Sequence, residues 1–383
     1  MTIAEQIRAA QLSIYRAHSI TAGAVVSPAL SLAVTATNKR TIFLNAKLES
    51  ALNDVFGTTY AKNQRIARVL YRINPGYRDD GLSQSAITGA WKAEKYEFEL
   101  GGNCTANWTK EQRKELIQTG KVKGAEGHHQ FSVKYHSDKQ ADPNNIKFYK
   151  TRKEHLVEGH GGDFHNESDA PMYDRRQRLI STKRRSVIKN ELLGGTITAT
   201  ISFITAASLR FVIEMVKSNR NPEDIKRARN LALIEGAQAA GFALVSYGLA
   251  KLSYYGAKRG LELLGIELSE KGMMLLGGSI AAIISSVAVG VITYIKLRKM
   301  GYNHQEAGIQ AWKAATISLS ISLVSALLYA AVGAPLTLGI NLIVGLGFAS
   351  YTLYTTLHEK QLMERLQVLT IEEISKRCLP MVA

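Results

Sequence analysis

The sequence predicts a mainly α-helical chain in which a short polar segment, rich in histidine, precedes a helical region apolar enough to cross a membrane. Two observations carry this prediction. Six of the nine histidines lie between His128 and His165, and long stretches without a charged side chain recur after Leu192. At 383 residues the chain has room for two or three domains.

Charge is uneven along the chain. The first 190 residues hold 30 Lys and Arg against 19 Asp and Glu, so they carry +11 of the total net charge of +16. This half is the better candidate for a polyanionic partner, although anionic lipid also attracts basic chains. Cys104 and Cys378 form neither a metal-binding pair nor a disulfide framework, which fits a reducing compartment. The early apolar patch is interrupted by Pro28 and is not expected to be a cleaved signal peptide.

Local signals outline the polar segment. Residues 1–88 read as mainly helical, with an amphipathic helix or two in "ESALNDVFGTTYAKNQRIARVLYRI" that end at the turn signal Asn74-Pro75-Gly76. The stretch "NWTKEQRKELIQTG" predicts a short helix capped by Thr109 and stopped by Gly120. After it come a short apolar run around "HHQFSV", a loop with "DPNNI" and a helical "RKEHLVEGH", which predicts the order strand, loop, helix.

Membrane helices are predicted from the charge-free stretches. Gly272–Ile295 has 24 residues without a charge, and Ala314–Leu357 has 44, with Gly333-Ala334-Pro335 in the middle. A span needs about 20 apolar residues, so the second stretch predicts two spans joined by a turn. Gly, Ala and Ser recur here, as in closely packed membrane helices. A large soluble bundle with buried helices is the alternative.

The adjacent histidines indicate chemistry. Side chains next to each other on a strand point to opposite faces, so His128 and His129 are expected to have different tasks. A catalytic divalent cation needs about three protein ligands and an open position. His128, His155 and His160 can supply the three, which leaves His129 as a general base with a pKa near neutrality.

This ordered set resembles the HNH (ββα-metal) endonucleases, most nearly the colicin-type DNases and the nuclease domains of bacterial polymorphic toxins. The likeness extends over "AWKAEKYEFELGGNCTANWTKEQRKELIQTGKVKGAEGHH", "DPNNIKFYKTRKEHLVEGHGGDFHNES" and the later "DRR". It implies a small ββα-metal domain that binds Mg, Mn, Ni or Zn. By position, it implies metal ligands at His128, His155 and His160, catalysis by His129, an orienting role for Asn145, and an active-site acid at Glu126.

One spacing departs from the resemblance. The two helix histidines are four residues apart in the colicin type, whereas His155 and His160 are five apart. Five residues turn about 500° on an α-helix, which rotates His160 roughly 100° beyond the expected face. A bend at Gly159 could restore it. Otherwise His165 or Glu126 becomes the candidate third ligand.

Basic residues flank this segment and predict the substrate contacts. The expected phosphate ligands are Lys150, Arg152, Arg175 and Arg176. Because nothing resembles a helix that reads bases, we expect cleavage of double-stranded DNA with little sequence preference.

These signals divide the chain into five parts. They are a helical N-terminal region (1–88), an HNH-type nuclease domain (89–180), a basic linker with an interfacial or first membrane helix (181–230), a region of about four spans (231–358) and a C-terminal tail (359–383). The basic loops "KSNRNPEDIKRARN" and "KLRKMGYN" are expected on the cytoplasmic side. The nuclease would share that side if Leu192–Val216 is an interfacial helix or a re-entrant hairpin.

Three functions fit these expectations. The first is a nuclease anchored in the bacterial inner membrane as part of a defence system. The second is a secreted toxin whose helices carry the nuclease into a target cell, with an immunity protein as partner. The third, which is not enzymatic, is a pore with a degenerate HNH-like region that tethers DNA. A regulatory protein, membrane lipid and further copies of the chain are the other expected partners.

Overall fold

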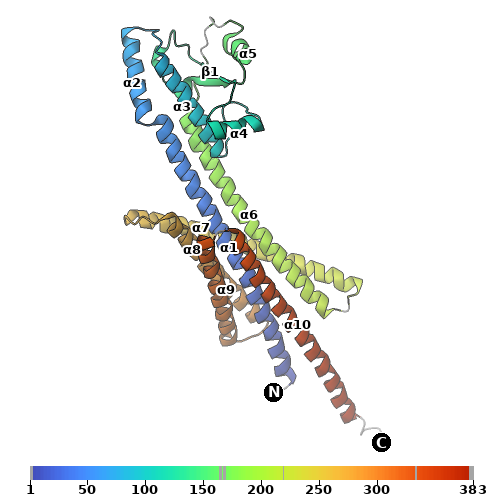
Figure 1. Cartoon of the computed structure of the whole chain (residues 1–383). Helices are drawn as coiled ribbons and strands as arrows, with labels where there is room; N and C mark the ends of the chain where they lie inside the picture. The colour runs from blue at the N-terminus through green and yellow to red at the C-terminus, as the bar shows by residue number, and fades with distance from the viewer. Residues whose placement is uncertain (1–2, 164–165, 167–169, 219, 333, 379–383) are drawn as a thin grey trace. The chain divides into compact units, whose positions relative to one another are not determined.

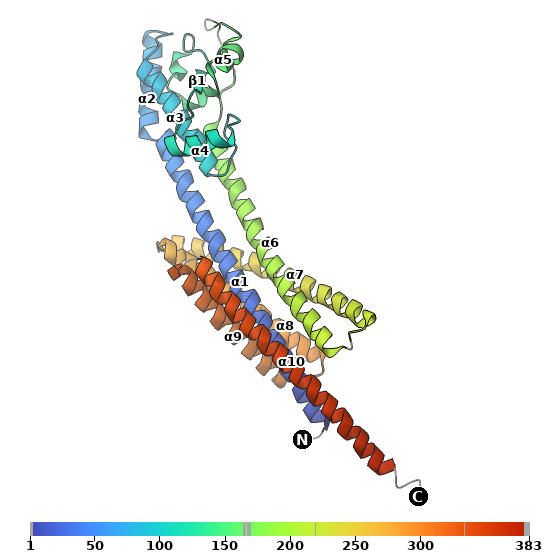
Figure 2. The same cartoon turned by 45° about the vertical axis from the view of Figure 1, so that its right-hand side comes forward.

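The computed structural model describes residues 3–163, 166, 170–218, 220–332 and 334–378. These residues are mainly helical, which confirms the predicted fold class (Figures 1 and 2). The α-helices are α1 Ile3–Phe56, α2 Thr58–Ile73, α3 Asp80–Glu99, α4 Lys110–Thr119, α5 Arg152–Glu154, α6 Arg175–Lys217, α7 Pro222–Leu263, α8 Glu270–Lys299, α9 His304–Val332 and α10 Ala334–Cys378. The strands are β1 Glu126–His129 and β2 Ile146–Tyr149, with short helical turns at Ser137–Lys139, Pro143–Asn145 and His155–Gly159.

The chain separates into two compact units. One is Arg40–Asn190, called the nuclease unit below, and the other is Met1–Lys39 with Glu191–Ala383, called the helical unit. The boundaries fall inside α1 and α6. The five sequence-based parts stay a prediction, and the two units are described separately.

Helix ends in the nuclease unit follow the sequence signals. The Thr109 hydroxyl accepts a hydrogen bond from the Gln112 amide, and the Gln112 side chain accepts one from the Thr109 amide, forming a capping box at the start of α4. Gly120 ends α4 with a φ of 79°, a conformation that glycine adopts without a steric cost. Asn74 caps α2 at the predicted turn. These caps confirm the predicted helix limits.

The histidine-rich segment forms a β-hairpin followed by a short helix. The two strands pair antiparallel, with Glu126 opposite Tyr149 and His129 opposite Ile146. The chain then enters α5, so the predicted strand, loop and helix are present in that order, with a second strand, β2, between the loop and the helix that the residue pattern did not predict. Trp91 of α3 stacks on Phe148 of β2 with ring centroids 3.8 Å apart, which fixes the hairpin on the helical core.

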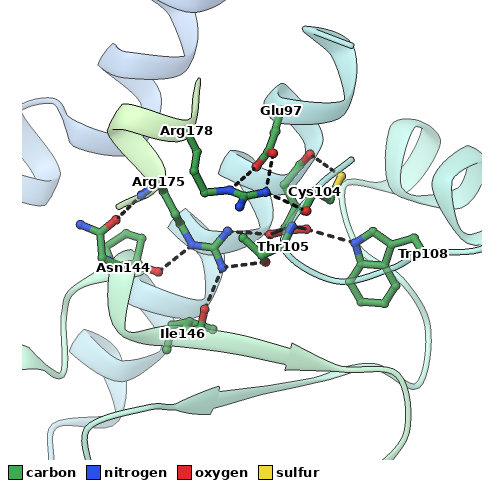
Figure 3. Close-up of polar contacts among 10 residues, drawn as sticks. Glu97, Cys104, Thr105, Trp108, Asn144, Ile146, Arg175 and Arg178 are labelled. Carbon is green, nitrogen blue, oxygen red and sulfur yellow. Dashed lines mark hydrogen bonds and ion pairs between the residues drawn. The ribbon is translucent and has the colours of Figure 1, made fainter. Parts of the chain in front are cut away.

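A buried ion pair ties the start of α6 to this core (Figure 3). The Arg175 guanidinium lies 2.6 Å from the Glu94 carboxylate, and both side chains are almost fully buried. Arg175 also donates to the Ile146 carbonyl at 2.7 Å, and Glu94 accepts from the Trp108 indole at 3.1 Å. Beside them Arg178 donates to Glu97 at 2.7 Å. This network connects α3, β2 and α6.

Among the residues that the structure describes, four helices are long and apolar enough to cross a membrane: α6, α7, α8 and α9. Three of them, α7, α8 and α9, coincide with expected spans, and α6 is the additional one. The fourth expected span falls in α10, part of whose side chains lie outside the described residues. Because Arg175–Lys217 is one continuous helix, a re-entrant hairpin at Leu192–Val216 is excluded. Of the predicted turn at Gly333-Ala334-Pro335, Gly333 lies outside the described residues, and α9 and α10 lie on either side of it.

The interior of the helical unit mixes small hydroxyl side chains with apolar ones, and its exterior carries many large apolar side chains. Its buried side chains include many hydroxyls, and Ser318 donates to Ser27 at 2.6 Å while Ser286 donates to Ser318 at 3.3 Å. Large apolar side chains such as Leu252 and Val287 are exposed. Exposed apolar side chains on helices of this length are compatible with association with a membrane.

Candidate metal centre and nuclease site

The adjacent histidines of β1 point in different directions, as expected for a strand. His128 is 6% exposed and its ring meets the rings of His155 and His160 at centroid distances of 5.1 and 4.6 Å. His129 instead lies against the loop before β2, with Nε2 3.2 Å from the Gln140 carbonyl. The two rings are therefore assigned to different environments.

Three histidines from the hairpin and the following helix converge. His128, His155 and His160, called the histidine cluster below, each offer a ligand atom within 4.8 Å of the others. Nδ1 of His128 lies 3.1 Å from Nε2 of His155. These separations allow one ion to contact all three rings.

A π-helical turn accounts for the five-residue spacing. Residues His155–Gly159 continue α5 with the wider turn of a π-helix, in which the hydrogen bond joins residues five apart. His160 caps that turn with an extended φ of −121°. The wider turn brings residue 160 back beside residue 155, so His160 reaches the cluster without a helix bend at Gly159. His165 lies outside the described residues.

Gly159 is required by the close approach of the rings. A Cβ added there would lie 3.0 Å from Cδ2 of His155, 3.1 Å from Cε2 of Tyr149 and 3.5 Å from Nδ1 of His128. The first two distances are shorter than ordinary van der Waals contact. Glycine thus leaves the space in which the histidine cluster assembles.

Acceptors behind two of these rings set their tautomers. His155 Nδ1 lies 2.7 Å from Oε2 of Glu126, and His160 Nδ1 lies 3.0 Å from the Asn166 carbonyl. Since these oxygens accept, Nδ1 of each ring donates to them, and Nε2 is the atom left to face a metal. An acceptor behind each ligand is the usual arrangement at histidine metal sites. Glu126, expected as an active-site acid, therefore lies behind a ligand.

Burial keeps the strand histidines neutral. Desolvation, aided by the nearby His160 and His155, lowers the pKa of His128 to about 3. Desolvation also lowers the pKa of His129 to about 4, below the near-neutral value expected from the sequence. Neutral imidazole has the lone pair that a metal requires, so the donor set fits a divalent ion.

His129 is oriented for proton transfer by its loop. Because the Gln140 carbonyl can only accept, Nε2 of His129 carries the hydrogen and Nδ1 is the basic atom. Asn145 is fully buried and fixes the backbone on both sides of this contact. It accepts from the Phe131 amide at 2.7 Å and donates to the carbonyls of Phe131 and Lys139 at 3.1 and 3.4 Å. These hydrogen bonds hold the backbone on either side of His129.

The predicted phosphate ligands separate into two groups. Arg175 is 1% exposed and its guanidinium is occupied by Glu94 and backbone carbonyls, so burial removes it from the surface that a phosphate can reach. This corrects its expected role to a structural one. Arg152 and Arg176 are exposed and Lys150 is half-buried. Arg152 lies 3.8 Å from Glu126, beside the histidine cluster.

The comparison with protein families agrees with this geometry. Residues 81–150 match a family model described as a GHH signature containing HNH/Endo VII superfamily nuclease toxin. This segment is similar to the Tox-GHH nuclease domains. Gly127-His128-His129 lies within the match, which ends before His155 and His160. The chain has no significant match among curated protein sequences or solved structures.

Two residues of the Tox-GHH site were not singled out from sequence. A Cβ on Gly127 would lie 3.2 Å from Ile146 and 3.3 Å from Ile87, so glycine lets β1 pack closely beside His128. Its place directly before the two histidines was the available signal. The second residue is Glu94, the ion-pair partner of Arg175. The segment "EKYEFE" contains three glutamates, and nothing in the sequence distinguishes the buried Glu94 from the other two.

Proposed function

We propose that the chain is a membrane-anchored nuclease toxin that hydrolyses phosphodiester bonds of double-stranded DNA with the help of a divalent metal. The observation that carries the proposal is the convergence of His128, His155 and His160 next to His129, within a nuclease toxin domain. Three imidazole ligands with an open position are the ligand set of a catalytic site.

Each site residue has a proposed task. The histidine cluster holds the ion, which supplies charge stabilisation at the phosphate when bound. Nδ1 of His129 takes the proton from the attacking water, and the Gln140 carbonyl keeps its ring in the required tautomer. Glu126 orients His155 through the 2.7 Å contact, and Asn145 holds the loop that carries the Gln140 acceptor.

Substrate binding is assigned to exposed cations. The proposed phosphate contacts are Lys150, Arg152 and Arg176. Arg175 is not among them, because its side chain is buried. Phosphate contacts carry no base information, so little sequence preference is expected.

Attachment to a membrane rests on the helical unit. The exposed apolar side chains of α7 and α8 and the buried hydroxyls between helices support residence in a bilayer. A continuous α6 leaves two arrangements, an interfacial helix or a single crossing. A toxin of the inner membrane, with an immunity protein as its partner, is the proposed biological setting.

Plasmid cleavage tests the enzymatic part. The full-length protein in detergent should nick and linearise plasmids of different composition with Mg²⁺, Mn²⁺, Ni²⁺ or Zn²⁺, and EDTA should stop the reaction. The His129→Ala variant should lose at least about 100-fold in rate, as expected for a general base. His136→Ala is the matched control and should cut normally. Absence of cleavage with every metal would favour the pore with a DNA-tethering domain instead.

A further inference from the structure

Two ion pairs lie at two different heights along the helices of the helical unit. At one level Lys251 of α7 lies 2.8 Å from Glu191 of α6 and donates to Asn38 of α1. At the other level Lys296 of α8 pairs with Glu235 of α7. Glu235 and Lys251 are 16 residues apart on α7, about 24 Å at 1.5 Å per residue.

A similar separation along the helix axis is found on α8. Gly277 lies against Asn38, since a Cβ there would collide with the Asn38 amide, and Lys296 is 19 residues further on, about 28 Å. Between the two levels α7 and α8 carry no charged side chain. The hydrocarbon core of a bilayer is about 30 Å thick, so the ion pairs fit its two boundaries.

A cavity opens at the second of these boundaries. It has a volume of about 400 Å³ and lies between α6, α7 and α8, with one residue of α1 in its wall. Its charged lining residues are Glu235, Lys296 and Lys299, and its apolar wall includes Phe242 and Val289. Phe242 is seven residues from Glu235 on α7, and Val289 is seven residues from Lys296 on α8. The apolar wall therefore lies about 10 Å from this ion pair, toward the middle of the two helices.

The charged side chains at the cavity indicate which kind of molecule it can bind. Glu235 neutralises Lys296, while Lys299 is exposed at the end of α8 and takes part in none of the ion pairs found among the described residues. The rim therefore has a surplus positive charge above an apolar wall. A molecule with an anionic head and a hydrocarbon tail matches both parts.

We propose that this cavity binds a phospholipid of the membrane, with an anionic headgroup at Lys299 and Lys296 and the upper part of one acyl chain between α6, α7 and α8. The proposal rests on the membrane attachment proposed above. The helices α6 and α7 are in close contact at Gly236, where a Cβ would be 3.0 Å from Ala207 and Phe203. The bound lipid fills the space beside this contact.

Photolabelling in lipid nanodiscs tests this site. The full chain is incorporated with a trace of phosphatidylglycerol that carries a diazirine on one acyl chain, and labelled peptides are mapped by mass spectrometry. Labelling should concentrate at Val289 and Ile292, which line the cavity and are half-buried, over Val245 and Val287, which are exposed and do not line it. Lys299→Glu should lower the labelling at the cavity about fivefold, the effect of one basic contact to an anionic headgroup.

Controls separate the possible failures. Lys271→Glu changes the same charge at the other end of α8 and should leave the labelling unchanged. Ala239→Trp should lower it by filling the cavity. Even labelling of lining and exposed residues, or unchanged labelling in Lys299→Glu, would overturn the lipid site. Failure of the wild type to enter nanodiscs would overturn the membrane attachment and this site with it, while plasmid cleavage by the same preparation reports on the nuclease separately.

Discussion

His155 and His160 lie at the two ends of one π-helical turn, and that turn brings both rings beside His128. Their ring centroids are 5.0 Å apart. In an α-helix the same spacing would put the two side chains on different faces. Single π-helical turns inside α-helices occur often at functional sites, and here the turn supplies the third ring of the histidine cluster.

Removing one residue from this turn should preserve the site. Val157 is 55% exposed, and its deletion leaves the histidines four residues apart, which an ordinary α-helical turn places on one face. We expect the deletion variant to bind a divalent ion and to cleave plasmid. An alanine inserted after Val157 makes the spacing six and should weaken metal binding by at least about tenfold. Calorimetric titration measures both, and equal binding by the two variants would contradict the role of the turn.

Adding a methyl group at Gly159 should damage the site. Its Cβ would lie 3.0 Å from the ring of His155 and 3.1 Å from that of Tyr149, so the rings must shift away from the cluster. Gly159→Ala should lower metal affinity and the cleavage rate together, by about tenfold or more. Gly241→Ala in α7, with nothing within 4 Å, is the matched control. Wild-type affinity in Gly159→Ala would show that the rings do not need this space.

Arg175 should act on stability. Arg175→Ala leaves the Glu94 carboxylate buried without its partner, a change that costs about 3–5 kcal/mol in other proteins. The thermal midpoint, followed by tryptophan fluorescence, should fall strongly, whereas Arg176→Ala at the exposed neighbour should leave it within a degree or two. If Arg175→Ala weakened DNA binding at an unchanged midpoint, Arg175 would be the substrate contact that the sequence suggested.

Cys104 should be unreactive in the folded chain. Burial, with the nearby Glu94 carboxylate, raises the pKa of this thiol well above its usual range. In a Cys378→Ser variant, maleimide labelling at pH 8 should be slow in the native protein and fast in denaturant. Because the unfolded thiol loses its proton near pH 8.5 and the folded one does not, stability should fall as pH rises above that value. Rapid labelling of the native protein would contradict the burial.

Sequence patterns predicted the parts of the nuclease unit that depend on local chemistry. The capping box at Thr109, the stop at Gly120 and the strand order around His128 follow from neighbouring residues, and all are present. Membrane helices were predicted from length and composition, and α7, α8 and α9 meet those criteria.

The remaining features depend on tertiary contacts. The π-helical turn needs three rings to pack around Gly159, which helix periodicity does not encode. The burial of Arg175 depends on Glu94, 81 residues earlier in the chain, so a basic run alone could not distinguish it from exposed Arg176. The continuity of α6 through Leu192–Val216 is a further example, since Arg210 and Glu214 inside this apolar stretch pair with each other at 2.8 Å.

The most direct test measures bound metal and plasmid cleavage in two variants of the same site. His129→Ala should keep one divalent ion per chain, counted by mass spectrometry of the metal, and lose cleavage, because it removes the base and leaves the ligands. His155→Ala should lose both the ion and cleavage. Cleavage at the wild-type rate in His129→Ala, or full metal content in His155→Ala, would contradict the assignment of the metal centre and its base.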